Sequence, residues 1–198
     1  MTFTIKKRQI MQNLITNLSN IINSDLIIPI ISKEITINEI KNESGCQKVI
    51  LKLTSKNIFA FSLDYQLQNK CKMFPFFNQS LGNITKVNDG IIFYKNGNDI
   101  FVLLIELKSN NLGDYKKQLQ AGKNFVNYLK NMLNLMLNKN YQIDKDNIRC
   151  IVFSTRKTQR KQGTKRENIK FDNINGLLIS EQQCNKTFYI EKFIKRVK

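Results

Sequence analysis

The most constraining feature of the sequence is an unbroken apolar run, Ile100–Ile105, that ends abruptly at Glu106-Leu107-Lys108. A strand that is apolar at every position has no face for solvent, so this run predicts a strand in the middle of a sheet covered on both faces. Asn96-Gly97 stands just before it and is the strongest short signal for a β-hairpin, with Gly90–Tyr94 as the antiparallel partner. Charged residues at the end of such a strand need local partners.

The other elements are read from their hydrophobic periodicity. We expect an amphipathic helix over 6–23, a hairpin of 49–53 with 58–63, a long helix over 114–137, and strands at 149–154 and 176–179. This order predicts an α/β fold with a mixed central sheet flanked by helices. No internal repeat or linker interrupts it, which indicates a single domain over 1–198, with a core over about 6–154 and a basic C-terminal extension over 155–198.

Charge and composition narrow the classes of function. The chain has no histidine, which excludes Ser-His-Asp and Cys-His hydrolysis and nucleases that use an imidazole base. Its 32 Lys and Arg residues against 15 Asp and Glu residues give a formal net charge of +17. A field of that sign and size concentrates polyanions, so nucleic acid is the first partner to consider.

The cysteines and the apolar runs bear on the compartment. Cys46, Cys71, Cys150 and Cys184 are widely spaced and form no CxxC pair, and the first residues do not read as a signal peptide. We therefore expect reduced, mostly buried thiols in a cytoplasmic protein. The longest apolar runs are far too short to span a bilayer, so no membrane partner is expected.

Asp89, Glu106 and Lys108 form the candidate reaction centre. Strand side chains alternate, so Glu106 and Lys108 point to one side of the sheet and Leu107 to the other. A hairpin with its turn at Asn-Gly places Asp89 opposite the region of Glu106 and Lys108. Two carboxylates at such a short distance repel each other unless a cation lies between them. Mg²⁺ or Mn²⁺ suits such oxygen ligands. Lys108 can then position or deprotonate an attacking water, or stabilise charge on a phosphate.

This motif resembles that of the PD-(D/E)XK nuclease superfamily, with Asn88-Asp89 in place of Pro-Asp and Glu106-Leu107-Lys108 intact. The resemblance extends over about 11–154 as element order, and the motif occupies its central part. It implies a restriction-endonuclease-like αβββαβ core and metal-dependent phosphodiester hydrolysis. Many members also carry a glutamine on the following helix. Gln118 lies nearer the apolar face of that helix than Gln120, so we assign the role to Gln118.

The sequence leaves open which other acidic residues belong to the site. Some members of the superfamily add an acidic residue on the first helix, where this sequence has none, so that role is vacant or supplied by Glu39 or Glu43. Asp64, which follows the apolar stretch 58–63, is a rival metal ligand. The alternative to a metal site is that Glu106 and Lys108 form an exposed ion pair at a strand end and that Asp89-Gly90 is an ordinary turn.

Basic residues near the candidate site predict phosphate contacts, which set affinity without reading base sequence. Those expected on the long helix are Lys116, Lys117 and Lys123, and those of the basic segment after the 149–154 strand are Arg156, Lys157, Arg160, Lys161, Lys165 and Arg166. A solvated basic loop is the alternative. Phe74, Phe76 and Phe77 are more typical of packing than of base stacking.

The sequence therefore predicts a Mg²⁺- or Mn²⁺-dependent endonuclease, with Asp89 and Glu106 as metal ligands and with Lys108 and Gln118 completing the catalytic set. DNA is the expected substrate because it is the usual one in this superfamily, and a homodimer is expected because one site cuts one strand. A restriction, defence, recombination or mobile-element role follows from the resemblance. The alternatives are an RNA-directed nuclease, a non-catalytic nucleic-acid-binding protein, and a protein whose charge serves an acidic protein partner.

Overall fold

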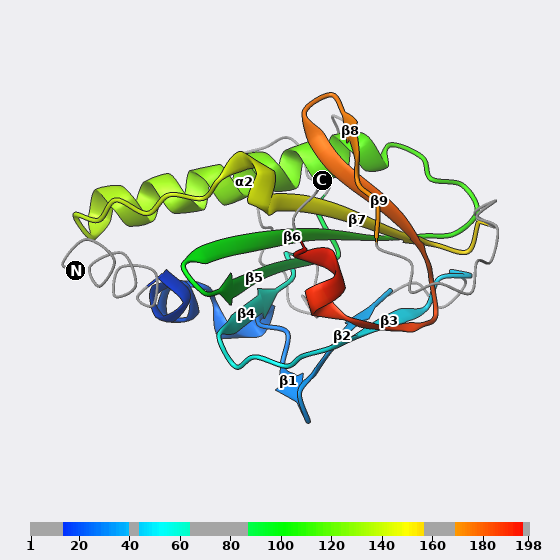
Figure 1. Cartoon of the computed structure of the whole chain (residues 1–198), viewed down its shortest axis with the longest axis horizontal. Helices are drawn as coiled ribbons and strands as arrows, with labels where there is room; N and C mark the ends of the chain where they lie inside the picture. The colour runs from blue at the N-terminus through cyan, green and yellow to red at the C-terminus, as the bar shows by residue number, and fades with distance from the viewer. Residues whose placement is uncertain (1–13, 40–43, 64–86, 157–168, 196–198) are drawn as a thin grey trace.

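The apolar run of the sequence becomes β6 (Asp99–Lys108), which lies inside a six-stranded sheet with the order β4-β5-β6-β7-β9-β8 (Figure 1). The computed structural model describes residues 14–39, 44–63, 87–156 and 169–195. The other strands of this sheet are β4 (Ile58–Phe61), β5 (Gly90–Asn96), β7 (Ile148–Ser154), β8 (Asp172–Ile174) and β9 (Leu177–Gln183). The sheet is mixed: β4, β5 and β6 are antiparallel, whereas β6, β7 and β9 are parallel.

The predicted hairpin before β6 and the long helix after it are both confirmed. Gly97, at a φ of 60°, supplies the turn that pairs β5 with β6, and Gly90 lies opposite Ile105. The helix is α2 (Tyr115–Met136), and its apolar face buries Leu119, Gly122, Val126, Leu129 and Leu133. Because α2 connects two parallel neighbours, it crosses over one face of the sheet, as parallel connections require.

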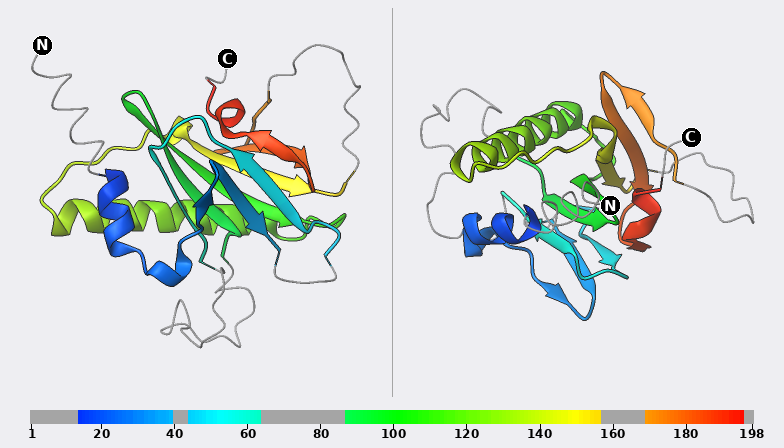
Figure 2. Two further views of the ribbon diagram at one scale, coloured as in Figure 1. Left: turned by 90° about the horizontal axis from the view of Figure 1, so that it is seen from below. Right: turned by 60° about the vertical axis from the view of Figure 1, so that its left-hand side comes forward.

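The second face of the sheet is covered by another sheet, which corrects the expectation of flanking helices. A four-stranded sheet has the order β1-β2-β3-β10, from β1 (Ile30–Ile31), β2 (Glu34–Asn38), β3 (Lys48–Lys52) and β10 (Thr187–Tyr189). Figure 2 shows this smaller sheet on the side of the central strands away from α2. Helical residues 14–21 lie on the α2 side, where Leu14 and Leu18 are buried.

Alternate residues of β6 supply two separate apolar cores. Val102 and Leu104 pack in the core under α2, whereas Leu103 and Ile105 pack against the smaller sheet. Glu106 and Lys108 continue the first set, so both belong to the α2 side of the sheet. Both faces of β6 are therefore covered, which explains why its sequence shows no polar alternation.

The predicted hairpin of 49–53 with 58–63 is wrong. β3 pairs with β2 and β10, and β4 pairs with β5, so the two strands belong to different sheets. Residues 53–57 carry the chain from one sheet to the other instead of turning it back. The three short 3₁₀ helices are η1 (Ser24–Leu26), η2 (Lys145–Asn147) and η3 (Ile190–Phe193).

The described residues after 169 belong to both cores. β9 joins the larger sheet, β10 joins the smaller one, and Ile190 and Phe193 of η3 are fully buried. Arg149 of β7 holds the C-terminal end of the described chain by hydrogen bonds. Its guanidinium donates hydrogen bonds to the carbonyls of Phe193 (2.6 Å) and Lys195 (2.5 Å), and it lies 5.1 Å from the ring of Phe101. Among the described residues, no helix is both long and apolar enough to cross a membrane.

The expectation of reduced cysteines is wrong for one pair. Cys46 and Cys184, 138 residues apart in sequence, form a disulfide, because the pairing of β10 with β3 brings their Cα atoms to 5.6 Å. The sequence spacing gave no sign of this pairing, since the contact depends on two strands that meet only in the folded protein. Cys150 on β7 is a buried free thiol, and burial raises its pKa to about 12.

We expect reduction of the Cys46–Cys184 bond to lower the free energy of unfolding by about 2–5 kcal/mol, because the bond closes a long loop in the unfolded chain. Thermal unfolding of the parent with and without dithiothreitol measures this. In a Cys46→Ser/Cys184→Ser variant the same reductant should leave the melting temperature unchanged. A peptide map without reduction that lacks the 46–184 cross-link would contradict the assignment.

Candidate functional site

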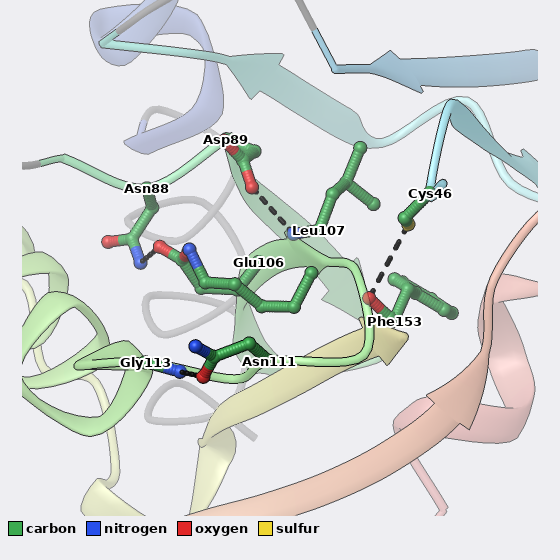
Figure 3. A network of polar contacts seen from close by, with 9 residues as sticks. Cys46, Asn88, Asp89, Glu106, Leu107, Asn111, Gly113 and Phe153 are labelled. Carbon is green, nitrogen blue, oxygen red and sulfur yellow. Dashed lines mark hydrogen bonds and ion pairs between the residues drawn. The ribbon is translucent and has the colours of Figure 1, made fainter. Parts of the chain in front are cut away.

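The candidate site lies where β5 begins and β6 ends, with Glu106 and Lys108 on the α2 side of the larger sheet. Asn88 and Asp89 immediately precede β5 and lie close to Glu106 (Figure 3). Glu106 and Lys108 are at the end of β6. Gly90, the first residue of β5, fits here because a Cβ at this position would lie 2.9 Å from Ile37 Cδ1 of the smaller sheet. The close contact between the two sheets therefore fixes where the site begins.

Glu106 is the centre of the cluster. Its side chain is 0% exposed, and the two carboxylate oxygens have different partners. The Asn88 amide donates a hydrogen bond to Oε1 at 2.9 Å, while Lys108 Nζ lies 2.8 Å from Oε2. The Glu106–Lys108 ion pair of the alternative interpretation is thus present. It is not an exposed pair, however, because the glutamate is completely buried and the lysine side chain is only 19% exposed.

Asp89 points toward the same strand end. Its Oδ2 accepts a hydrogen bond from the backbone N–H of Leu107 at 2.5 Å (Figure 3), and the residue is half-buried. That bond places Asp89 beside the residue between Glu106 and Lys108. The structure thus brings together Asp89, Glu106 and Lys108, with Asn88 as a fourth member that the sequence analysis treated only as a substitute for proline.

The electrostatics show two carboxylates that interact. Burial raises the pKa of Asp89 well above its ordinary value of 3.8, and the negative charge of Glu106 raises it further. Burial also raises the pKa of Glu106, although Lys108 and the amide of Asn88 oppose this. Glu39, one residue beyond β2, adds a smaller negative contribution at both groups. Glu39 is therefore near the site, whereas Glu43 and Asp64 lie outside the described residues.

The donors fit a hard divalent cation better than any other group. Asp89 and Glu106 offer carboxylate oxygens, and Mg²⁺ is typically held by one or two carboxylates while water and substrate phosphates fill its other positions. In the described part of the chain, no set of three or more acidic, cysteine or histidine side chains gathers as a closed metal site. A cation held by Asp89 and Glu106 would therefore depend on non-protein oxygen ligands.

The predicted glutamine lies on the inner side of α2. Gln118 is half-buried, whereas Gln120 is exposed and donates a hydrogen bond to Asn124 at 3.1 Å. The helical periodicity predicted that Gln118 lies nearer the apolar face than Gln120, and the structure buries Gln118 more than Gln120. Gln118 precedes by one turn Gly122, which contacts Asn88.

The predicted phosphate-binding residues have different surroundings. Lys116 and Arg156 are exposed, and Lys117 is 82% exposed beside Asp114 at 3.4 Å. Lys123 donates a hydrogen bond to the carbonyl of Gly176 at 2.9 Å, which ties it to the β8–β9 turn. Lys157, Arg160, Lys161, Lys165, Arg166 and the phenylalanines Phe74, Phe76 and Phe77 lie outside the described residues.

A further carboxylate at this edge was missed in the sequence. Glu181 of β9 accepts a hydrogen bond from Ser154 Oγ at 2.8 Å, and the register places Val152 between Glu106 and Glu181. All three residues therefore share one row of the sheet. The strand predicted from the sequence ended at 179, before the polar residues. Continuing the alternation past Ile179 would have found Glu181 on the same face.

Loop contacts hold the strand end that carries Lys108. Ser109 Oγ accepts a hydrogen bond from the N–H of Gly45 at 3.1 Å and lies 3.2 Å from Ser44 Oγ. Thr155 Oγ1, after β7, donates to Asn110 Oδ1 at 3.2 Å. The chain on either side of the cluster is thus pinned to neighbouring segments, which limits the directions that Lys108 can take.

Comparison with known proteins assigns no family here: no protein-family model, no curated protein and no solved structure matches the chain. The function is therefore argued from the residues themselves.

The raised pKa of Asp89 predicts that Asp89→Asn stabilises the protein at pH 7 when metal is chelated. In the folded protein the carboxyl keeps its proton to a higher pH than in the unfolded chain. Its contribution to stability is therefore present at low pH and is lost as the pH rises through the folded-state pKa. Melting temperatures measured in EDTA should favour the variant at pH 7, and this gain should vanish near pH 4.

Asp99→Asn is the matched control, because Asp99 is an exposed residue at the opposite end of β6. It should change the melting temperature by a similar, small amount at both pH values. An Asp89→Asn variant that is no more stable than the parent at pH 7 would contradict the repulsion described above.

Proposed function

We propose that this protein is a metal-dependent endonuclease of the PD-(D/E)XK type that hydrolyses phosphodiester bonds of DNA. The observation that carries the proposal is the buried Glu106 carboxylate, which is held between Asn88 and Lys108 with Asp89 bonded to the intervening backbone N–H. Burying an ionised group in this way is costly, so a purely structural role for it is a poor explanation.

The order of elements supports the same proposal. Helical residues 14–21, then β4, β5, β6, α2 and β7, follow the αβββαβ order of the restriction-endonuclease-like core, with the first strands of the smaller sheet inserted after the helix. In that core the acidic residue is on one strand and E-x-K is on the next. Here Asp89 directly precedes β5, and Glu106-Leu107-Lys108 ends β6, the neighbouring strand.

In the proposed reaction, each residue of the site would have a separate role. A divalent ion bound by Asp89 and Glu106 would supply Lewis-acid activation of water and would offset charge on the phosphate. Asn88 holds one oxygen of Glu106, so the carboxylate keeps a single orientation. The Lys108 ammonium, next to the other oxygen, is placed to orient the attacking water or to stabilise negative charge on the phosphate. Gln118 would position the same groups from α2.

The net charge of +17 supports a polyanionic substrate, and the exposed Lys116, Lys117 and Arg156 would contact its phosphates. DNA rather than RNA, a homodimer, and a role in restriction, defence, recombination or mobile-element activity rest on the resemblance to the superfamily. A non-catalytic DNA-binding protein with the same charge is the competing hypothesis, and metal-dependent cleavage distinguishes the two.

Supercoiled plasmid, linear duplex, single-stranded DNA and RNA should be tested in parallel with Mg²⁺, Mn²⁺ and EDTA. We expect cleavage that requires a divalent ion, together with a loss of roughly 10²- to 10⁴-fold in Asp89→Ala and Lys108→Ala while DNA binding is largely retained. Asp99→Ala and Lys139→Ala are the matched controls. Retention of DNA without metal-dependent products would support the binding-only hypothesis, and an Asp89→Ala variant as fast as the parent would refute the site.

The predicted phosphate contacts can be tested without cleavage by measuring binding in EDTA over a range of salt concentrations. Removing one cationic side chain that binds a phosphate should reduce the slope of log K against log salt by roughly 0.9 for duplex DNA. We expect that change for Lys116→Ala and for Arg156→Ala. Lys139→Ala is the control, because Lys139 follows the C-terminal end of α2, roughly 30 Å from Lys116 at 1.5 Å per helical residue. An unchanged slope in both test variants would exclude these contacts.

A further inference from the structure

Asn88 contacts both the site and the helix above it. Its side chain is 0% exposed, and its amide nitrogen donates to Glu106 Oε1 at 2.9 Å. The other end of the carboxamide, Oδ1, is buried and has no hydrogen-bond partner among the described residues. A buried polar atom in that state is uncommon, so its position calls for an explanation.

Gly122 of α2 accounts for the space that this oxygen occupies, because it has no side chain there. A Cβ at position 122 would lie 2.8 Å from Asn88 Cγ, and it would overlap Oδ1 even more severely. Gly122 is in the interior of α2, where glycine is the least favourable residue after proline and alanine is the most favourable. The carboxamide of Asn88 therefore occupies the volume that any other side chain at 122 would fill.

We propose that Asn88 is a positioning residue for Glu106 and that Gly122 is the residue whose small size lets Asn88 reach it. This rests on the proposed metal-dependent function, because Glu106 is the ligand being oriented. The carboxamide bond to Oε1 fixes the orientation of the carboxylate, with Lys108 beside Oε2. Each oxygen keeps a second lone pair, so both can still face a cation. Asparagine does not ionise, so it donates to the carboxylate without adding a third negative charge beside Asp89.

The contact between Asn88 and Gly122 is tested by stability alone. Gly122→Ala in the parent should lower the melting temperature by roughly 5 °C or more, although alanine favours the helix. In an Asn88→Ala background the same substitution should raise it by roughly 2–4 °C, since the volume is then free. Ala121→Gly, at the exposed neighbouring position, calibrates the helix-propensity effect. An effect of equal sign in both backgrounds would overturn the role of Gly122.

The positioning role is tested by metal binding. Isothermal titration of Mn²⁺ into Asn88→Ala and Asn88→Leu should give a dissociation constant roughly 10- to 100-fold above that of the parent, the range typical when a partner of a metal ligand is removed. Leucine retains a similar volume without a donor, so Asn88→Leu separates the hydrogen bond from packing. The concentration of Mg²⁺ that half-saturates cleavage should rise in both variants.

The outcomes distinguish this proposal from the function on which it rests. A parent that neither binds Mn²⁺ nor cleaves DNA would refute the metal site and the positioning role together. A parent that does both, with Asn88→Leu equal to it in Mn²⁺ affinity and in Mg²⁺ half-saturation, would overturn the positioning role alone. Weakened metal binding in Asn88→Leu, together with the reversal of sign at Gly122, would support it.

Discussion

The burial of one carboxylate determines much of what surrounds it. Glu106 lies near the end of a strand that is apolar on both faces and is completely buried, so its charge depends on the groups placed directly against it. Asn88 and Lys108 provide that compensation from opposite sides. The approach of α2 to the sheet then depends on Asn88, because helix and carboxamide meet at Gly122.

The arrangement of the two sheets explains why this site is at an edge of the fold. β5 and β6 run between the smaller sheet on one face and α2 on the other, and the contact of Ile37 with Gly90 fixes the start of β5. Beyond that contact the smaller sheet contributes Glu39, whose charge acts on both carboxylates. The apolar layers thus end where Glu39 after β2, Asp89 before β5 and Glu106 of β6 approach one another.

Local patterns predicted the elements that depend on neighbours in sequence. The Asn-Gly turn, the periodicity of α2 and the apolar stretch of β7 each indicated the observed element, and the alternation of β6 placed Glu106 and Lys108 on one face. Non-local contacts could not be predicted in this way. The separation of β3 from β4, the Cys46–Cys184 bond and the contact of Asn88 with Gly122 depend on segments that meet only in the folded chain. Asn175-Gly176, which turns β8 into β9, was a local signal that the sequence analysis missed.

The pairing of β3 with β10 has a consequence for how the protein is made. β1, β2 and β3 leave the ribosome early, but their fourth strand is translated only after the whole larger sheet. During synthesis, β3 therefore presents one unpaired edge, and Cys46 waits for Cys184, its partner in the folded protein. Such an edge can pair with other chains, so a nascent polypeptide would benefit from a chaperone until the late strand arrives to close the ladder.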